Sequence, residues 1–141
     1  MMPPTVKALR PRPTRGRKAL HGKDSGAHAV EFAIVALPLL IVTFMVTQAA
    51  LVFHARSMAL AAATQGANVA RGYGSSLAAG ENKATAFLDT VGQGLRDPEV
   101  EATTSGTDVT VTVTGRAPSI IPFMTFNVSQ SASGPIERFV P

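Results

Sequence analysis

Few side chains in this sequence are of the types that perform catalysis or bind metals. The only histidines are His21, His28 and His54, and there is no cysteine. The histidine spacing fits neither a zinc site nor a Ser-His-Asp triad, and no glycine-rich phosphate-binding loop occurs. We therefore predict that the protein is not an enzyme, and we expect no metal, no cofactor and no small-molecule substrate.

The most informative spacing places a glycine five residues before an acid, at the start of an apolar run. Gly26 and Glu31 stand in the stretch GAHAVEF. A small residue before a scissile bond lets the backbone enter a protease active site, and an acid at the edge of an apolar helix is costly in lipid, which points to a function. The alternative is that Glu31 is an interfacial acid that only marks where the lipid begins.

The apolar run that follows is long enough to span a membrane. From Phe32 to Phe53, 22 consecutive residues carry no formal charge. A helix of this length extends about 33 Å, and the hydrocarbon core of a bilayer is about 30 Å thick. Pro38 lies inside the run, but membrane helices tolerate proline. We predict a transmembrane helix over 27–53; a secretory signal peptide is a weaker alternative because its apolar region is shorter and lacks an acid.

The positive charge of the chain is concentrated before this span. Residues 1–28 carry a net charge of +6 and the remaining residues a net charge of −2. We predict that residues 1–26 form a disordered basic leader. Its basic residues nearest the span are Arg15, Arg17, Lys18 and Lys23. Such an arm could bind nucleic acid, but its position before an apolar span favours a role in topology, because positive charge keeps a flank in the cytoplasm.

An alanine-rich extension of the helix is predicted over 54–72. Four of its small residues recur at a spacing of four and therefore share one helix face: Ala55, Ala59, Ala63 and Ala67. Small residues at this spacing let another helix approach closely. The alternative is that these alanines are present only because alanine favours helix formation.

A second, amphipathic helix is predicted over 75–96, with Ser75 or Ser76 as its cap. Its apolar residues recur at the helical period, which indicates packing against the first helix. These residues are Ala84, Phe87, Leu88, Val91 and Leu95.

The last third of the chain has the period of strands. Val109, Val111 and Val113 alternate with threonines, which predicts a strand with one buried face. A preceding alternating segment, separated from it by residues 105–108, predicts a hairpin, and the alternation over 126–132 predicts a third strand. We therefore predict a small antiparallel three-stranded sheet within 99–134, a tail over 135–141 and an α+β fold for the chain.

The junction resembles a known processing site. Gly26, Glu31 and the apolar run resemble the site at which a prepilin peptidase cuts type IV prepilins after the glycine. The sequences of Ala29–Ala33 and of Leu37–Leu40 resemble, more narrowly, those of the TadE/TadG-like minor pseudopilins of tight-adherence (Flp) pilus systems. The Val111–Val113 strand, the Pro118–Pro122 connection and the serine-rich last strand also resemble the exported region of that family.

The resemblance implies specific roles for three residues. Gly26 would end the leader, Ala27 would begin a mature chain of 115 residues, and Glu31 would be the fifth mature residue, whose carboxylate meets the Ala27 amine of the same or a neighbouring subunit. The position of Ala27 departs from the pattern, because major pilins favour an aromatic residue there. The exported part is also longer than in short Flp pilins, which favours a minor subunit.

The implied function is therefore assembly of a tight-adherence pilus or a related secretion apparatus. The protein would be a single-pass protein of the bacterial inner membrane, with its N-terminus in the cytoplasm and its C-terminal region outside. Its expected partners are the lipid bilayer, a prepilin peptidase, other pilins and pseudopilins, and pilus assembly membrane proteins, but not nucleic acid. The alternative is an unprocessed single-pass anchor whose exported domain binds another ligand.

Overall fold

The structure, a computed structural model, describes residues 24–138. The leader residues Arg15, Arg17, Lys18 and Lys23, expected to set the topology, lie outside this range. The described residues divide into two units between Leu37 and Pro38.

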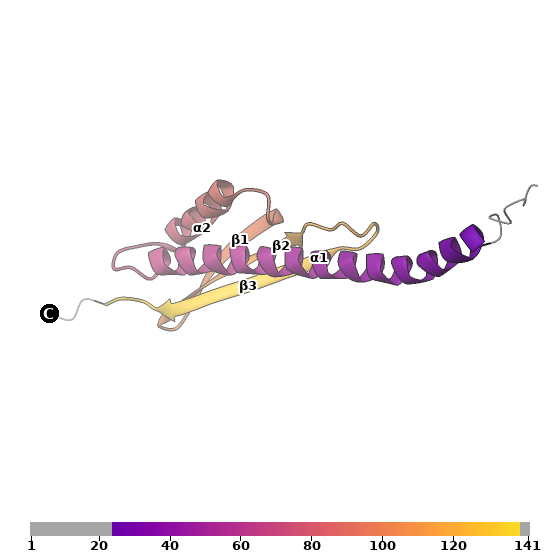
Figure 1. Ribbon diagram of the computed structural model, residues 1–141. Helices are drawn as coiled ribbons and strands as arrows, with labels where there is room; N and C mark the ends of the chain where they lie inside the picture. The colour runs from indigo at the N-terminus through magenta and orange to yellow at the C-terminus, as the bar shows by residue number, and fades with distance from the viewer. Residues whose placement is uncertain (1–23, 139–141) are drawn as a thin grey trace, which may run out of the picture. The chain divides into compact units, whose positions relative to one another are not determined.

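Helix α1, Asp24–Ala70, runs through both units and includes Pro38 (Figure 1). Its portion from His28 to Ala70 is long and apolar enough to cross a membrane. None of the 18-residue window that carries this signal is buried against other parts of the chain. The central helix of a soluble domain would be buried at such positions, so these apolar side chains are left for another environment.

Helix α2, Leu77–Val91, begins at a serine cap and ends at a glycine. The Ser76 hydroxyl accepts a hydrogen bond from the Ala79 backbone N–H at 3.2 Å. Gly92 adopts a positive φ of 83°, a conformation that other residues rarely adopt. The helix therefore ends five residues before the expected boundary at 96.

The three strands form one antiparallel sheet in the order β1-β2-β3. They are β1 Arg96–Ser105, β2 Asp108–Ala117 and β3 Phe126–Pro135. Val111 at the centre of β2 pairs with Ala102 of β1 and Ala132 of β3. The predicted hairpin and third strand are thereby confirmed.

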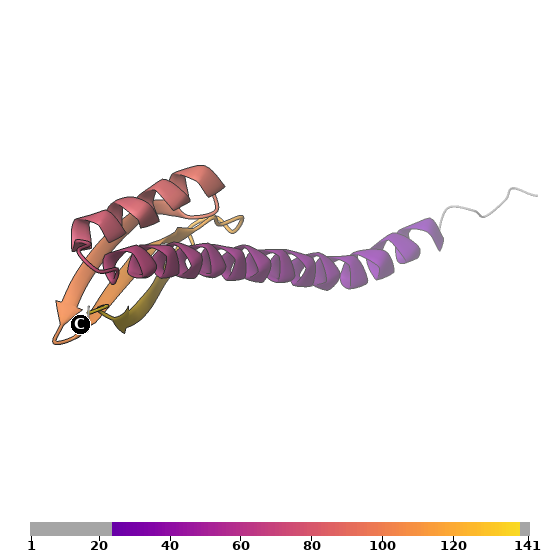
Figure 2. The same ribbon diagram turned by 90° about the vertical axis from the view of Figure 1, so that its left-hand side faces the viewer.

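Both helices contribute to one core that covers a single face of the sheet (Figure 2). On β2, Val109, Val111 and Val113 are no more than 2% exposed, while the threonines between them point to the other face. From α2, Ala84 and Leu88 enter the same core. The α+β fold predicted from the change of period is confirmed.

The two helices approach closely because glycines face each other where they meet. A Cβ added to Gly80 of α2 would lie 2.6 Å from the Ala70 Cβ and 2.7 Å from the Gly66 carbonyl oxygen of α1. No side chain fits in that space, so only glycine permits this contact. The predicted apolar stripe is only partly buried, because Val91 at the end of α2 remains 43% exposed.

Candidate functional site

The predicted processing junction lies within α1, in the first unit. Gly26 is exposed, and a Cβ added to it would meet no atom within 4 Å. Packing inside the described chain therefore does not require glycine at this position. A requirement for glycine here would have to come from another molecule, such as a peptidase.

Glu31 is exposed on the same helix. Its Oε2 lies 3.9 Å from the Nδ1 of His28, and both side chains are about four-fifths exposed. Ala27 and Glu31 are four residues apart in α1, so their backbones lie about one helical turn apart.

The four alanines that were predicted to share one helix face, called the alanine seam below, lie in the core of the second unit. Ala55, Ala59 and Ala63 are completely buried and Ala67 is 4% exposed. They pack with the buried residues of α2 and the sheet in one cluster. This face of α1 is therefore covered by the chain's own domain and is not available to a neighbouring subunit in this conformation.

Gln48 is a residue that the sequence analysis did not single out. It is the one polar or charged residue found buried in the described chain, at 4% exposure. Its Nε2 donates to the Pro118 carbonyl oxygen at 3.1 Å, and its Oε1 accepts from the Ile120 N–H at 2.9 Å. The nitrogen and the oxygen of the Gln48 amide thus both connect α1 to the loop between β2 and β3, about 70 residues later in the chain.

A signal for Gln48 was present in the sequence. Thr43 and Thr47, the other polar residues nearby, satisfy their hydroxyls on carbonyl groups of their own helix four residues back. A glutamine amide inside an apolar segment has no such local partner, and an unpaired polar group is costly there. A lone Gln in the run therefore predicts a partner from elsewhere in the fold.

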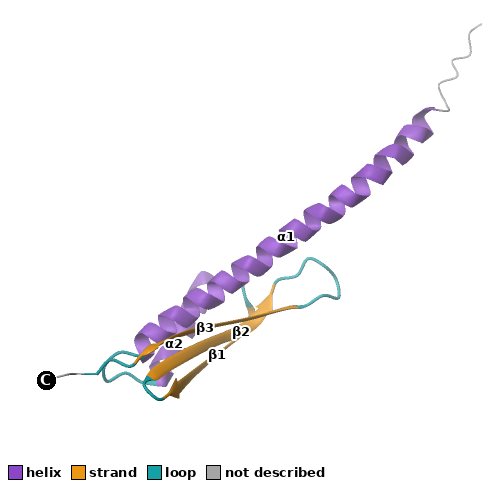
Figure 3. Cartoon of the chain, turned by 90° about the horizontal axis from the view of Figure 1, so that it is seen from below, coloured by secondary structure: helices purple, strands orange, loops and turns teal. Residues whose placement is uncertain are grey.

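The connection that Gln48 holds is the β2–β3 loop, residues 118–125, which extends alongside α1 (Figure 3). It contains no charged residue. The Ser119 hydroxyl donates to the Ile121 carbonyl oxygen and accepts from the Ile121 N–H, at 2.9 and 3.2 Å. The Met124 N–H donates to the Ile121 carbonyl at 3.4 Å, and the two prolines have no N–H. Three of the loop's six backbone N–H groups, those of Ile120, Ile121 and Met124, therefore donate to groups of the protein itself.

Phe123 stands at the tip of this loop with its side chain fully exposed, at 106% of the reference area. Its φ is +65°, which is unusual for a bulky residue. Such a backbone conformation costs about 1–3 kcal/mol, and residues that adopt it cluster at functional sites. Ile120 and Met124 on the same loop are also large, apolar and exposed.

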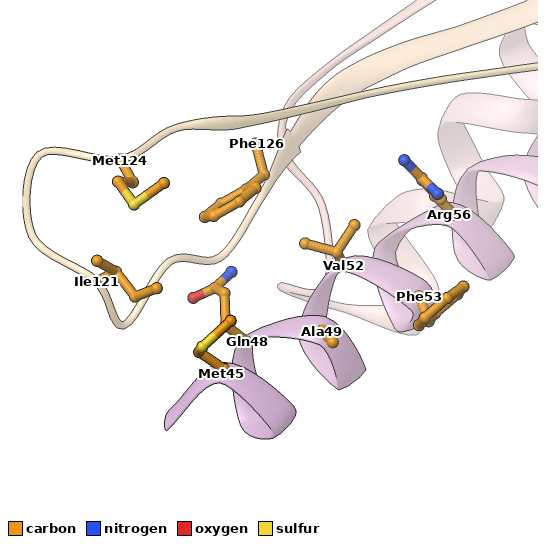
Figure 4. A pocket seen from close by; sticks show the side chains of 9 residues that line it. All are labelled: Met45, Gln48, Ala49, Val52, Phe53, Arg56, Ile121, Met124 and Phe126. Atoms are coloured by element: carbon orange, nitrogen blue, oxygen red, sulfur yellow. The ribbon is translucent and has the colours of Figure 1, made fainter. Parts of the chain in front are cut away.

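Two apolar hollows lie where the loop meets α1. One, of about 360 Å³, has Ile121, Met124 and Phe126 on its loop side (Figure 4). Six residues of α1 form its other side: Met45, Gln48, Ala49, Val52, Phe53 and Arg56. The second, of about 340 Å³, lies between the loop and Ile41, Phe44 and Met45. The surface of the helix and the surface of the loop are therefore one continuous apolar surface.

The described residues offer little for catalysis or metal binding. Between residues 24 and 138 no group of three His, Cys, Asp or Glu side chains is placed to hold a metal ion. Asp97 forms an ion pair with Arg116, and both are exposed. What this geometry provides is an apolar helix, a domain packed on it and an apolar loop beside it, which suits anchoring and assembly.

Comparison with known protein families also supports a role in anchoring and assembly. The TadE-like protein family matches residues 26–68, which begin at Gly26 and include most of α1. No curated protein and no solved structure matches the chain. The resemblance to TadE-like proteins is thus confirmed over 43 of the 141 residues. The chain is TadE-like in this segment, which associates it with Tad pili and, together with the apolar helix, with anchoring in a membrane.

Proposed function

We propose that this protein is a TadE-like minor pseudopilin, a membrane-anchored subunit that takes part in assembling a tight-adherence pilus or a related secretion apparatus. Its leader stays in the cytoplasm, a prepilin peptidase cuts after Gly26, and the domain of residues 54–138 faces outward from the bacterial inner membrane. The single observation that carries the proposal is that the TadE-like match begins at Gly26, the residue before the predicted cut.

The structure supports this proposal because the fold of the described chain does not require glycine at position 26. The space around this residue is open, so a larger side chain fits without disturbing the chain's own fold. A substitution that blocks cleavage would therefore act through the peptidase and not through misfolding. This separates the processing role of Gly26 from a structural one.

Glu31 is proposed to act after cleavage. Its carboxylate is exposed and has no described partner other than the His28 ring. A new α-amine at Ala27 would add a positive charge at the N-terminal end of a helix, where the helix dipole is already positive. A carboxylate one turn later offsets both, in the same subunit or in a neighbour.

The test is N-terminal sequencing of the protein purified from membranes of its native host. We expect a chain that begins at Ala27 and a Gly26→Leu variant that keeps its full length. A Gly22→Leu variant is the matched control, because it makes the same change four residues upstream and should still be cut after Gly26.

Glu31→Gln should leave the cut in place but reduce the amount of protein that copurifies with pilus components. Protein beginning at Met1 or Met2 in the unmodified strain would refute cleavage. It would favour the alternative of an unprocessed single-pass anchor with an outward-facing binding domain.

A further inference from the structure

We propose that the β2–β3 loop is a second membrane contact, which inserts Ile120, Phe123 and Met124 into the outer interface of the bilayer beside α1. This inference depends on one part of the proposed function, namely that α1 anchors the protein in a membrane. The loop would be a second contact that holds the exported domain against the lipid surface and fixes its distance from the bilayer.

The first observation is continuity with the apolar helix. The loop residues Ile120, Ile121 and Pro122 line one hollow together with Ile41, Phe44 and Met45. Ile41, Phe44 and Met45 belong to the uncharged run of α1 and are at least half exposed. If this part of the helix is in lipid, the loop that lies against it is in lipid or at its edge.

The second observation is the extent of the contact. The loop reaches along the helix from Gln48 to Ile41, seven residues or about 10 Å at the rise of an α-helix. An interfacial helix buries its apolar face about 5–10 Å into the boundary between headgroups and acyl chains. A membrane boundary near Gln48 therefore places the loop tip at the depth of an interfacial contact. Residues 27–48 would still extend about 33 Å, enough for the hydrocarbon core.

The third observation concerns the backbone. Irregular chain is excluded from lipid unless its polar groups are paired. Here the Pro118 carbonyl and the Ile120 N–H are bonded to Gln48, and Ser119 bonds both backbone groups of Ile121. These bonds pair backbone groups in the first half of the loop, which lowers the cost of taking that half out of water.

The fourth observation is the side chain at the tip. Phe123 is held fully exposed by a backbone conformation with positive φ. An exposed phenylalanine in a loop without charge suits insertion at the bilayer interface, because Trp, Phe and Leu form the buried face of interfacial elements. Lipid is favoured over a partner protein as the occupant because the adjoining apolar surface of α1 is itself the predicted span.

The chain contains no tryptophan, so a single introduced tryptophan reports on its own surroundings. We would place full-length Phe123→Trp in phosphatidylcholine vesicles at low protein-to-lipid ratio and measure its quenching by lipids brominated near the headgroup or deep in the chains. Thr107→Trp is the control, because Thr107 is exposed in the β1–β2 turn at the opposite end of β2. Leu37→Trp, on the uncharged part of α1, reports on the anchor itself.

We expect blue-shifted emission and quenching of Trp at 123 chiefly by the shallow bromines, quenching at 37 chiefly by the deep bromines, and none at 107. Met124→Trp repeats the measurement in case the strained position 123 does not accept tryptophan. Quenching at 37 without quenching at 123 or 124 would overturn the loop contact and leave the anchor standing.

No quenching at any position would refute the anchor as well as the loop contact. A blue shift at 123 that appears only as the protein is concentrated in the vesicles would show that a second copy, and not lipid, covers the loop. That result would also overturn the proposal.

Discussion

Replacing Gln48 with leucine should release the β2–β3 loop from α1. The two side chains are similar in size, but leucine leaves the Pro118 carbonyl and the Ile120 N–H without the partners that now lie 3.1 and 2.9 Å away. A buried group left unsatisfied costs about 1–3 kcal/mol, and these two part-buried groups belong at the lower end of that range. The additional buried carbon of leucine recovers about 0.8 kcal/mol.

The net cost to the docked loop is therefore at least about 1 kcal/mol. Since about 1.4 kcal/mol corresponds to a factor of ten, the Ile120 amide should exchange at least about fivefold faster with deuterium. The assay is hydrogen exchange of the full-length protein in lipid nanodiscs, followed at the Ile120 amide. The β2 amides serve as an internal reference, because opening of the loop alone should leave them unchanged.

Gln65→Leu is the matched control. Gln65 stands on the same helix, but it is exposed, so the same substitution should leave the Ile120 amide unchanged. The reasoning is refuted if Gln48→Leu does not accelerate exchange at Ile120. It is also refuted if Gln65→Leu produces the same acceleration, because the effect would then come from the helix in general and not from the pair of hydrogen bonds.

Three further substitutions test the packing of the domain, each by hydrogen exchange of the β2 amides. Gly80→Ala should destabilise the domain by about 1–3 kcal/mol, because its Cβ would lie 2.6 Å from the Ala70 Cβ, and Ala70→Gly should restore part of the loss. Val111→Ala should cost about 2–3 kcal/mol, because it empties a completely buried site. Ser76→Ala should cost about 1 kcal/mol through loss of the helix cap, whereas Ser75→Ala should be nearly neutral.

Each of these three has an outcome that contradicts it. A stabilising Gly80→Ala would mean that the helices separate at little cost and that helix propensity decides the result. If Val111→Ala left the stability of the domain unchanged, β2 would not form the centre of the core. A Ser76→Ala as neutral as Ser75→Ala would show that the hydroxyl of the cap contributes nothing.

The secondary structure could be predicted from the sequence because its signals are local. The uncharged run from Phe32 to Phe53 predicted the apolar part of α1 through its length alone. Alternation of Val and Thr over 109–114 predicted β2 and its buried face, since side chains on a strand alternate between faces. The glycine–glutamate spacing directed attention to residue 26, where the TadE-like match begins.

The boundaries of α2 were less well determined. The apolar stripe continues to Leu95 in the sequence, but Gly92 takes a positive φ and ends the helix, and Leu95 is buried from a turn. Periodicity cannot distinguish a residue buried by a helix from one buried just beyond it.

Only the tertiary structure decided what the alanine seam and Gln48 contact. The spacing of Ala55, Ala59, Ala63 and Ala67 shows that they share a face, but it is the chain's own sheet and second helix that cover this face. Gln48 meets Pro118 and Ile120 across 70 and 72 residues. Local sequence determines which face of a helix is small, apolar or polar, because that depends on the geometry of one element. It does not determine what packs there, because that depends on how distant segments are brought together in the folded chain.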